Sequence, residues 1–350
     1  MKFRKILKTL LVVGLVVCLA LIGRQTLSIA QQSRPSESAI YNRQTFSGPY
    51  THQNLTLYLV HSDDQIKAEN ILSLQEALDQ QKVRVHETSN VNQLAVENIS
   101  KNEVIYIQAG EIVRGGKQDR VLEIDLLVKP KSGKVPIGSF CVEQGRWRRR
   151  GNESPSYFSS SNNIVSSKGL KLAVTKSRKQ HEVWSQVADT QRRLSKNLRS
   201  PVTSRTSETS LELSLENRKL QKSVDNYTSK LSSVINDKDN TVGMVSVING
   251  KIYCADTYAS SKLFRKLWPK LLKANAIEAI ASKHNSKIEK LPTINDVQKF
   301  LSAAQQGKAT TKKVSASIKM ITRDSNECVM YETFDKKDST ISLHRNYVKK

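Results

Sequence analysis

Residues 110–147 read GEIVRGGKQDRVLEIDLLVKPKSGKVPIGSFCVEQGRW, and this stretch decides the expected fold. Two largely apolar runs, VLEIDLLVKP and VPIGSFCVE, are typical of strands, and KSGK at 131–134 predicts the turn between them. Polar clusters stand at both ends of the stretch. Because the ends of paired strands can meet on one edge of a sheet, these clusters are candidates for a ligand site.

The residues before this stretch extend the β pattern. Runs at 55–62, 83–88, 93–100 and 103–110 predict strands. SLQEALDQ, which begins at Ser73, predicts one helix with a capping box formed by Ser73 and Glu76. A βαβ nucleotide-binding fold needs helices between the later strands, and none is indicated there. We therefore expect an antiparallel N-terminal region of five or more strands.

Helical patterns become more frequent after residue 180. Periodic apolar positions at 181–198 and 211–235 predict helices, and a third at 260–283 is expected to break or kink at Pro269. LKLAVTKS at 170–177 and three runs after residue 313 predict strands, and Asn249-Gly250 predicts a hairpin turn. The predicted fold class is α+β, with an antiparallel β-rich N-terminal half packed with a helical C-terminal half.

Composition divides the chain into four parts. Residues 1–30 are predicted to be a signal peptide or signal anchor, and residues 31–54 a linker. The main α+β domain is expected at 55–290, with Ser-rich insertions near 151–169 and 200–210. A C-terminal helix and strand extension is expected at 291–350.

The N-terminus predicts the compartment. Four basic residues precede an apolar run at 9–23, and Ser28-Ile29-Ala30 offers a cleavage site. Fifteen helical residues span roughly 22 Å, less than the roughly 30 Å hydrocarbon core of a bilayer. The pattern favours an exported protein, periplasmic or extracellular, with a membrane anchor through residues 9–23 as the alternative.

The chain is strongly basic, with a formal net charge of +24. Such a charge favours anionic partners, either a small molecule or an envelope component. Nucleic acid is disfavoured as a partner of an exported protein. A solvated basic surface that serves solubility is the alternative, because the basic residues are scattered along the whole chain.

The two polar clusters contain a candidate anion site. Guanidinium and ammonium groups of Arg120, Arg146 and Lys117 are suited to phosphate or carboxylate. The remaining candidate ligand residues add amide groups, an aromatic ring and a flexible glycine: Gly116, Gln118, Gln144 and Trp147. The alternative is a tight turn with salt-bridged Lys and Arg.

Glu111 and Glu143 are the candidate acid and base of a catalytic pair, if they lie close together. Alternatively, they pair with Arg120 and Arg146, which would lower their pKa values. Cys141 is a conceivable nucleophile, but its strand context favours a buried thiol.

Metal and cofactor sites are not indicated. The histidines are dispersed, no cysteine has a zinc-site spacing, and no dinucleotide or P-loop fingerprint is present. We therefore predict neither a metal nor a cofactor. Cys254 and Cys328 are either a disulfide or two buried thiols.

The motifs GEIVRGGKQDRV, CVEQGRW and QHEVWSQV, together with residues 243–279, resemble the ARG and rhodanese-phosphatase-superfamily-associated protein domain of bacteria. The similarity covers roughly residues 55–280. The resemblance implies that the motif residues, including Gln180 and Trp184, are notable positions of the family. The family's association with ADP-ribosylglycohydrolase-type and phosphatase-type proteins hints at phosphate-bearing ligands by context alone. Asp119, the Ser-rich insertions and the C-terminal extension depart from the family pattern.

Three functions fit these observations. The first is binding of an anionic ligand or envelope component through Lys117, Arg120 and Arg146. The second is hydrolysis of a nucleotide or ADP-ribose derivative, with Glu111 or Glu143 as general base. The third is an envelope scaffold whose long helix at 211–235 mediates protein contacts.

Overall fold

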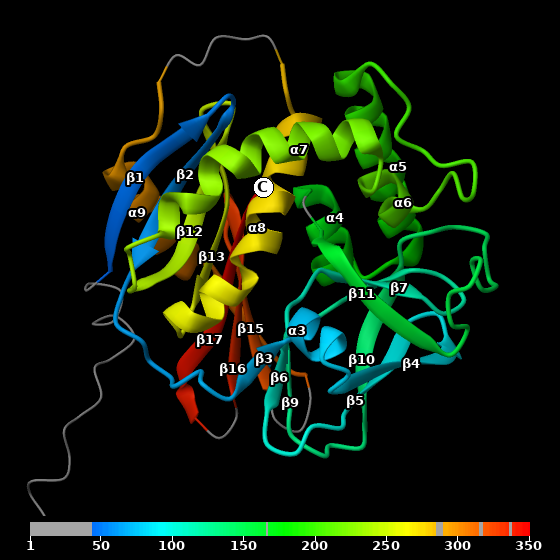
Figure 1. Ribbon diagram of the computed structural model, residues 1–350. Coiled ribbons are helices and arrows are strands. Elements are labelled where there is room, and N and C mark those ends of the chain that lie inside the picture. Colours follow the sequence, from blue (N-terminus) through cyan, green and yellow to red (C-terminus); the bar gives the residue numbers. More distant parts are fainter. Residues whose placement is uncertain (1–43, 166, 285–289, 315–317, 336–337) are drawn as a thin grey trace, which may run out of the picture. The chain divides into compact units, whose positions relative to one another are not determined.

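The largest element of the fold is an antiparallel sheet of eight strands that draws on both ends of the chain (Figure 1). The computed structural model describes residues 44–165, 167–284, 290–314, 318–335 and 338–350. In spatial order the strands are β1 (Thr45–His52), β2 (Leu55–His61), β12 (Thr241–Ile248), β13 (Lys251–Tyr258), β17 (Asp338–Lys349), β16 (Cys328–Asp335), β15 (Ile318–Asp324) and β14 (Lys308–Lys313).

Both faces of this sheet are covered, which explains the continuous apolar run in β2. Leu57 and Leu59 join a core that includes the long central helix, whereas Tyr58 and Val60 pack with a helix near residue 300 on the other face. Side chains alternate between the faces of a strand, so a strand covered twice has no polar side.

A closed antiparallel barrel is the second β element. Its strands, in order around the ring, are β10 (Lys134–Cys141), β5 (Gln93–Asn98), β4 (Val83–Asn90), β11 (Tyr157–Ile164), β7 (Glu111–Gly115) and β8 (Arg120–Leu122). All six strands contribute an apolar side chain to one core cluster: Val85, Leu94, Val113, Leu122, Ile137 and Phe158. Closure removes the exposed edges that an open sheet of this size would have.

A three-stranded sheet and the helices complete the fold. The small sheet contains β3 (Ile71–Ser73), β6 (Val104–Ile107) and β9 (Leu126–Val128). The helical segments are α3 (Leu74–Asp79), α4 (Lys168–Leu172), η1 (Ala173–Ser177), α5 (Gln180–Leu198), α6 (Leu211–Leu215), α7 (Arg218–Leu231), η2 (Ser232–Ile235), α8 (Ser261–Ala281) and α9 (Ile294–Gln305). Helix α8 contacts β12 of the large sheet and β11 of the barrel, and therefore links the two β elements.

The predicted division into a β-rich N-terminal half and a helical C-terminal half is wrong. Strands β12 to β17 all follow residue 240 and join β1 and β2 in the large sheet. Most of the helical residues lie between the barrel strands and these late strands in sequence. Period-two patterns indicated several late strands, but a strand pattern does not say which strand it pairs with.

Regular elements also occur in the segments that the sequence predicted as linker, insertion and extension. The predicted linker at 31–54 contains β1, which pairs with β2, and the predicted extension at 291–350 supplies four strands of the large sheet. The Ser-rich insertion at 151–169 contains barrel strand β11. The predicted strand at 170–177 is helical, as α4 and η1. The predicted signal segment, 1–30, lies outside the described residues.

Several local predictions agree with the structure. The capping box of Ser73 and Glu76 begins α3, and Asn249 and Gly250 connect β12 to β13. Helix α8, which was expected to break or kink at Pro269, continues through this residue as one helix.

The segment at 211–235 is three helical pieces instead of one long helix, because Asn217 caps the start of α7. Its apolar positions Leu220, Val224, Tyr227 and Leu231 are buried in the main core. The stripe on which the scaffold hypothesis relied therefore packs inside this protein.

Candidate functional site at the mouth of the barrel

One end of the barrel, called the mouth below, gathers Glu87, Lys117, Arg120 and Cys141 at or near strand ends. Strands β4 and β8 are three places apart in the ring of six. An ion pair between Glu87 and Arg120 therefore spans the barrel, with 3.6 Å between Oε2 and Nη2. The two side chains are 4% and 0% exposed, so the pair lies beneath the surface.

Arg120 has unused hydrogen-bonding capacity. Its Nη1 donates to the carbonyl of Gln118 at 3.0 Å. Its Nε and Nη2 have no hydrogen-bond partner among the described residues. The guanidinium lies 5.6 Å from the ring centroid of Trp147, and the ammonium of Lys117 lies 5.0 Å from it. Trp147 is 43% exposed, so an aromatic ring flanked by two cations closes the mouth.

The backbone at the mouth is fixed by Gly116. Its φ of +53° lies in the left-handed region. A Cβ at this position would lie 2.4 Å from a ring carbon of Phe158. This close approach brings the backbone N–H of Lys117 to Glu87, where it donates at 3.1 Å. The glycine thus permits the close approach of the barrel's own side chains.

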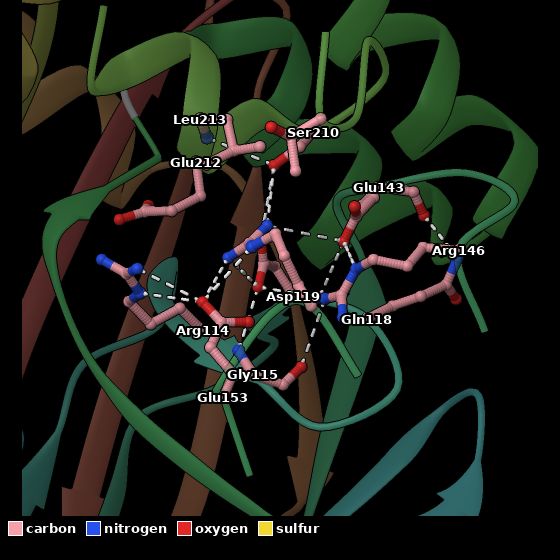
Figure 2. Close-up of polar contacts among 12 residues, drawn as sticks. Arg114, Gly115, Gln118, Asp119, Glu143, Arg146, Glu153, Ser210, Glu212 and Leu213 are labelled. Carbon is pink, nitrogen blue, oxygen red and sulfur yellow. Dashed lines mark hydrogen bonds and ion pairs between the residues drawn. The ribbon is translucent and has the colours of Figure 1, made fainter. Parts of the chain in front are cut away.

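A second group of charges, the arginine–carboxylate cluster, lies beside the mouth and consists of Asp119, Glu143, Arg146, Arg150 and Glu153 (Figure 2). Arg150 contacts both oxygens of Asp119, at 2.8 and 3.2 Å, and Oε1 of Glu153 at 2.8 Å. Arg146 donates to Glu143 at 2.6 Å and approaches Asp119 at 3.4 Å. Asp119 also accepts from the backbone N–H of Gly115 at 3.0 Å.

The arginines of the cluster are held by its carboxylates. Burial alone would lower the pKa of Arg150, but its hydrogen bonds and charge interactions with Asp119 and Glu153 raise it above the usual value. Arg114 is held in the same way by Glu153 and Glu216. These arginines therefore have carboxylate partners already and are poor candidates for an external anion.

Helix α5 braces the segment between the mouth and the cluster. Gln180 accepts from the backbone N–H of Cys141 at 2.9 Å and donates to its carbonyl at 2.8 Å. Trp184 Nε1 and Gln118 Nε2 both donate to the carbonyl of Glu143, at 3.2 and 2.9 Å. The motif residues Gln180 and Trp184 thus position the chain that leads to Trp147.

The two candidate catalytic carboxylates have separate partners. Glu111 accepts from Lys270 of α8 at 2.9 Å and from the backbone of Gln108 at 3.0 Å. Glu143 pairs with Arg146. The expected pairing of Glu143 is therefore present, whereas Glu111 pairs with Lys270 in place of Arg120. The contacts of the two carboxylates give no shared site for acid and base catalysis.

Cys141 is buried, and burial raises the pKa of its thiol, as it does for Cys254. All three cysteines of the described residues are free and buried. A thiol with a raised pKa is a weak nucleophile, which agrees with a structural role.

The site contains residues that the motif analysis did not select. Glu87 comes from a strand remote in sequence, Asp119 is a departure from the family pattern, and Arg150 lies outside the motifs. Arg148 and Arg149, next to Trp147, are exposed and make no ion pair within the described part of the chain. The run Arg148-Arg149-Arg150, directly after Trp147, is the sequence signal that could have identified these three arginines.

Gln144, also a predicted ligand residue, is exposed, and its backbone bonds Thr209. Within the ranges given above, the structure has no group of His, Cys, Asp and Glu side chains arranged to hold a metal ion. Among the same residues, no helix has the length and apolar character needed to cross a bilayer.

Comparison with known families agrees with the motif resemblance. Residues 43–344 match the ARG and Rhodanese-Phosphatase-superfamily-associated Protein domain. The chain belongs to this family. The family match begins before β1 and ends within β17, so it includes the segments at 43–54 and 291–344 that the motifs alone did not reach. No curated protein and no solved structure matches the chain.

Proposed function

We propose that the mouth of the barrel binds an anionic group, held by Lys117 and Arg120 against the ring of Trp147. The observation that carries the proposal is the state of Arg120, a fully buried guanidinium beneath an exposed ring whose Nε and Nη2 make no hydrogen bond to any described residue. Buried polar groups are nearly always hydrogen-bonded, and the exceptions concentrate where a protein binds or reacts. A phosphate or carboxylate oxygen supplies the missing acceptor.

The charge distribution supports an anion over a cation. Arg114, Arg146 and Arg150 are neutralised by carboxylates, whereas Lys117, Arg148 and Arg149 have no carboxylate side chain within ion-pair distance among the described residues. The mouth has one carboxylate, Glu87, against Lys117 and Arg120. An excess of positive charge around a hydrogen-bond donor is the arrangement that recognises an anion.

The proposal extends to the compartment. The basic start of the chain and the apolar run at 9–23 support export or membrane anchoring, as argued from the sequence. Outside the cytoplasm, the anionic ligands available to a basic domain include phosphate-bearing small molecules and envelope polymers. The mouth binds the anionic group that these ligands share.

Tryptophan fluorescence, to which Trp147, Trp184 and Trp268 contribute, provides a test, because an anion at Arg120 changes the charges next to the ring of Trp147. The purified protein is titrated with inorganic phosphate, ADP-ribose, a phosphosugar and an anionic envelope polymer, and thermal unfolding is followed in parallel. A ligand at about 100 times its dissociation constant stabilises the folded state by about 2.7 kcal/mol. We expect a saturable fluorescence change and a raised melting temperature for at least one ligand.

Matched variants separate the mouth from the general basic charge. Lys117→Met and Trp147→Leu are expected to weaken binding at least tenfold. Lys176→Met removes the same charge from a surface pair with Asp324 and is expected to leave binding unchanged. Equal weakening by Lys117→Met and Lys176→Met, or no binding of any of these probes, contradicts the proposal.

A further inference from the structure

A second buried ionic group joins three segments that are far apart in sequence. His344 of β17 contacts Asp125, in the connection from β8 to β9, with 2.8 Å between Nδ1 and Oδ2. On the other side of the ring, its Nε2 lies 3.1 Å from Oδ1 of Asp256 in β13. All three side chains are at most 5% exposed. We call these three residues the His344 bridge.

Neighbouring groups hold each member of the bridge in place. Asp125 accepts from Thr333 at 2.6 Å and from the backbone N–H of Ala109 at 2.8 Å. Asn346 donates to Asp256 at 2.7 Å. The ring of Tyr258 stacks on the imidazole, with 4.5 Å between centroids and 10° between planes. The bridge therefore connects the large sheet to the chain that leads from the barrel into β9.

The geometry requires a protonated imidazole. A neutral imidazole has one N–H, so it donates to one carboxylate and turns a lone pair toward the other. Only the imidazolium ion donates to Asp125 and Asp256 at once. Burial alone would lower the pKa of His344, but the charges of Asp125 and Asp256 and hydrogen bonds to both raise it to about 9. The pKa values of Asp125 and Asp256 are lowered, because attraction to His344 and, for Asp256, to Lys171 outweighs burial.

Other titratable groups around the bridge come from every element packed against it. They are Tyr258 of β13, Lys171 of α4, Tyr106 of β6, Glu111 of β7, Glu123 of the β8–β9 connection and Tyr331 of β16. Glu123 is paired with Arg178 and Lys312, and Glu111 with Lys270. Burial raises the pKa of Tyr331 to about 12 and those of Tyr106 and Tyr258 well above the usual value. The pKa of Lys171 is also raised, because attraction to Cys254, Asp256 and Glu278 outweighs its burial. His344 is therefore the group of the bridge expected to change charge between pH 7 and 10.

A cavity of about 40 Å³ lies against the bridge. Its lining includes Asp125, His344, Lys171 and Thr333. The rest of the lining is mostly apolar, but these polar groups face a space large enough for a water molecule. It gives the carboxylate of Asp125 room to move away from the imidazole and become hydrated, which a close-packed apolar surrounding would prevent.

We propose that the His344 bridge is an ionic clamp that holds the chain around Asp125 onto the large sheet and releases it in alkaline solution, while the sheet itself stays folded. The protonated imidazole closes the clamp by donating to both carboxylates. Loss of one proton to hydroxide leaves a single N–H, and the contact with Asp125 opens toward the cavity.

Hydrogen exchange followed from pH 6 to 10, corrected for the intrinsic rate, tests the clamp in the full chain. We expect residues 108–126, which include the Ala109 amide bonded to Asp125, to lose at least tenfold in protection as the pH passes about 9. Strand β12 keeps its protection over the same range. NMR titration of the His344 ring is expected to show its midpoint at the same pH.

Two variants sharpen the test. In His344→Gln, residues 108–126 are expected to show low protection from hydrogen exchange at every pH. The glutamine amide is neutral, so it has no positive charge with which to hold both carboxylates. His86→Gln, which changes a histidine paired with Glu97 on the barrel, is expected to keep the wild-type transition. Protection of 108–126 that persists to pH 10, or that is lost together with that of β12, overturns the proposal. The wild-type titration decides the question even if His344→Gln does not fold.

Discussion

The arginine–carboxylate cluster and the His344 bridge solve one physical problem with different cations. Each buries carboxylates that would be costly without a positive partner. In the cluster the partners are guanidinium groups, which stay charged at any pH that a protein tolerates. In the bridge the partner is an imidazole whose charge depends on a proton. Two ionic groups of similar burial can therefore respond to pH in different ways.

The first test of this comparison removes the central carboxylate of the cluster. Asp119→Asn leaves Arg150 and Arg146 without their shared partner, and breaking a buried ion pair costs about 3–5 kcal/mol of unfolding free energy. Urea denaturation measures the loss. Asp225→Asn, on the exposed side of α7, is the control and is expected to change stability by less than about 0.5 kcal/mol. Equal effects of the two substitutions would show that the cluster contributes nothing beyond a surface charge.

The second test compares pH responses. The pKa of His344 is about 9, above its ordinary 6.5, so the stability that its proton provides is fully present below pH 6.5 and is lost as the pH rises through about 9. A shift of this size corresponds to about 3 kcal/mol. His344→Gln is therefore expected to destabilise by about 3 kcal/mol at pH 6 and by much less at pH 10.

The cluster provides the contrast. The cost of Asp119→Asn is expected to be the same at pH 6 and pH 10, because its arginines do not titrate in that range. Urea denaturation of both variants at the two pH values measures the difference. A cost of His344→Gln that is constant with pH would mean that the bridge holds no extra proton.

The sequence predicted the cluster's region but not the bridge, for a physical reason. The cluster's five residues lie within residues 119–153, and three of them, Asp119, Glu143 and Arg146, stand in the two quoted motifs. Asp125 lies in the quoted stretch, but as one polar position among strand residues, and His344 is a dispersed histidine near the C-terminus. His344 meets Asp256 because β17 pairs with β13 in the large sheet, and Asp125 reaches the imidazole from outside that sheet; no local pattern specifies either contact.

The same reasoning explains what was predictable in the fold. The capping box of Ser73 and Glu76 and the turn at Asn249-Gly250 depend on residues that are neighbours in sequence. The barrel and the eight-stranded sheet depend on the order of strands, which joins residues 45–61 to residues 241–248. Local chemistry was predictable, and the partners of the strands were not.

The third and smaller expected effect concerns the turn that leads to Asp119 of the cluster, where backbone conformation and packing both require a glycine. The bridge has no glycine constraint of this kind. Gly116 and Gly133 both have positive φ, at +53° and +63°, but a Cβ meets Phe158 at the first and nothing within 4 Å at the second. Alanine costs about 1–2 kcal/mol at either position through its backbone conformation. Overpacking adds about 1–3 kcal/mol at Gly116 alone. Urea denaturation of both variants measures the difference, and equal costs would show that Phe158 moves aside freely.

The smallest effect separates a cation of the mouth from a cation of the cluster. Lys117→Met and Arg150→Met each remove one positive charge from side chains within the same 34 residues of sequence. Lys117 touches Ser89 and the ring of Trp147, a cation–π contact worth about 0.5–1 kcal/mol at an accessible site. Arg150 holds two carboxylates, and its loss leaves Asp119 with Arg146 alone and Glu153 with Arg114 alone. We therefore expect Lys117→Met to cost at most about 1 kcal/mol, and Arg150→Met several times more. If chemical denaturation shows that Lys117→Met lowers the free energy of unfolding by a large amount, this lysine stabilises the mouth. A cation that is needed to hold the fold together is poorly placed to exchange partners with a ligand.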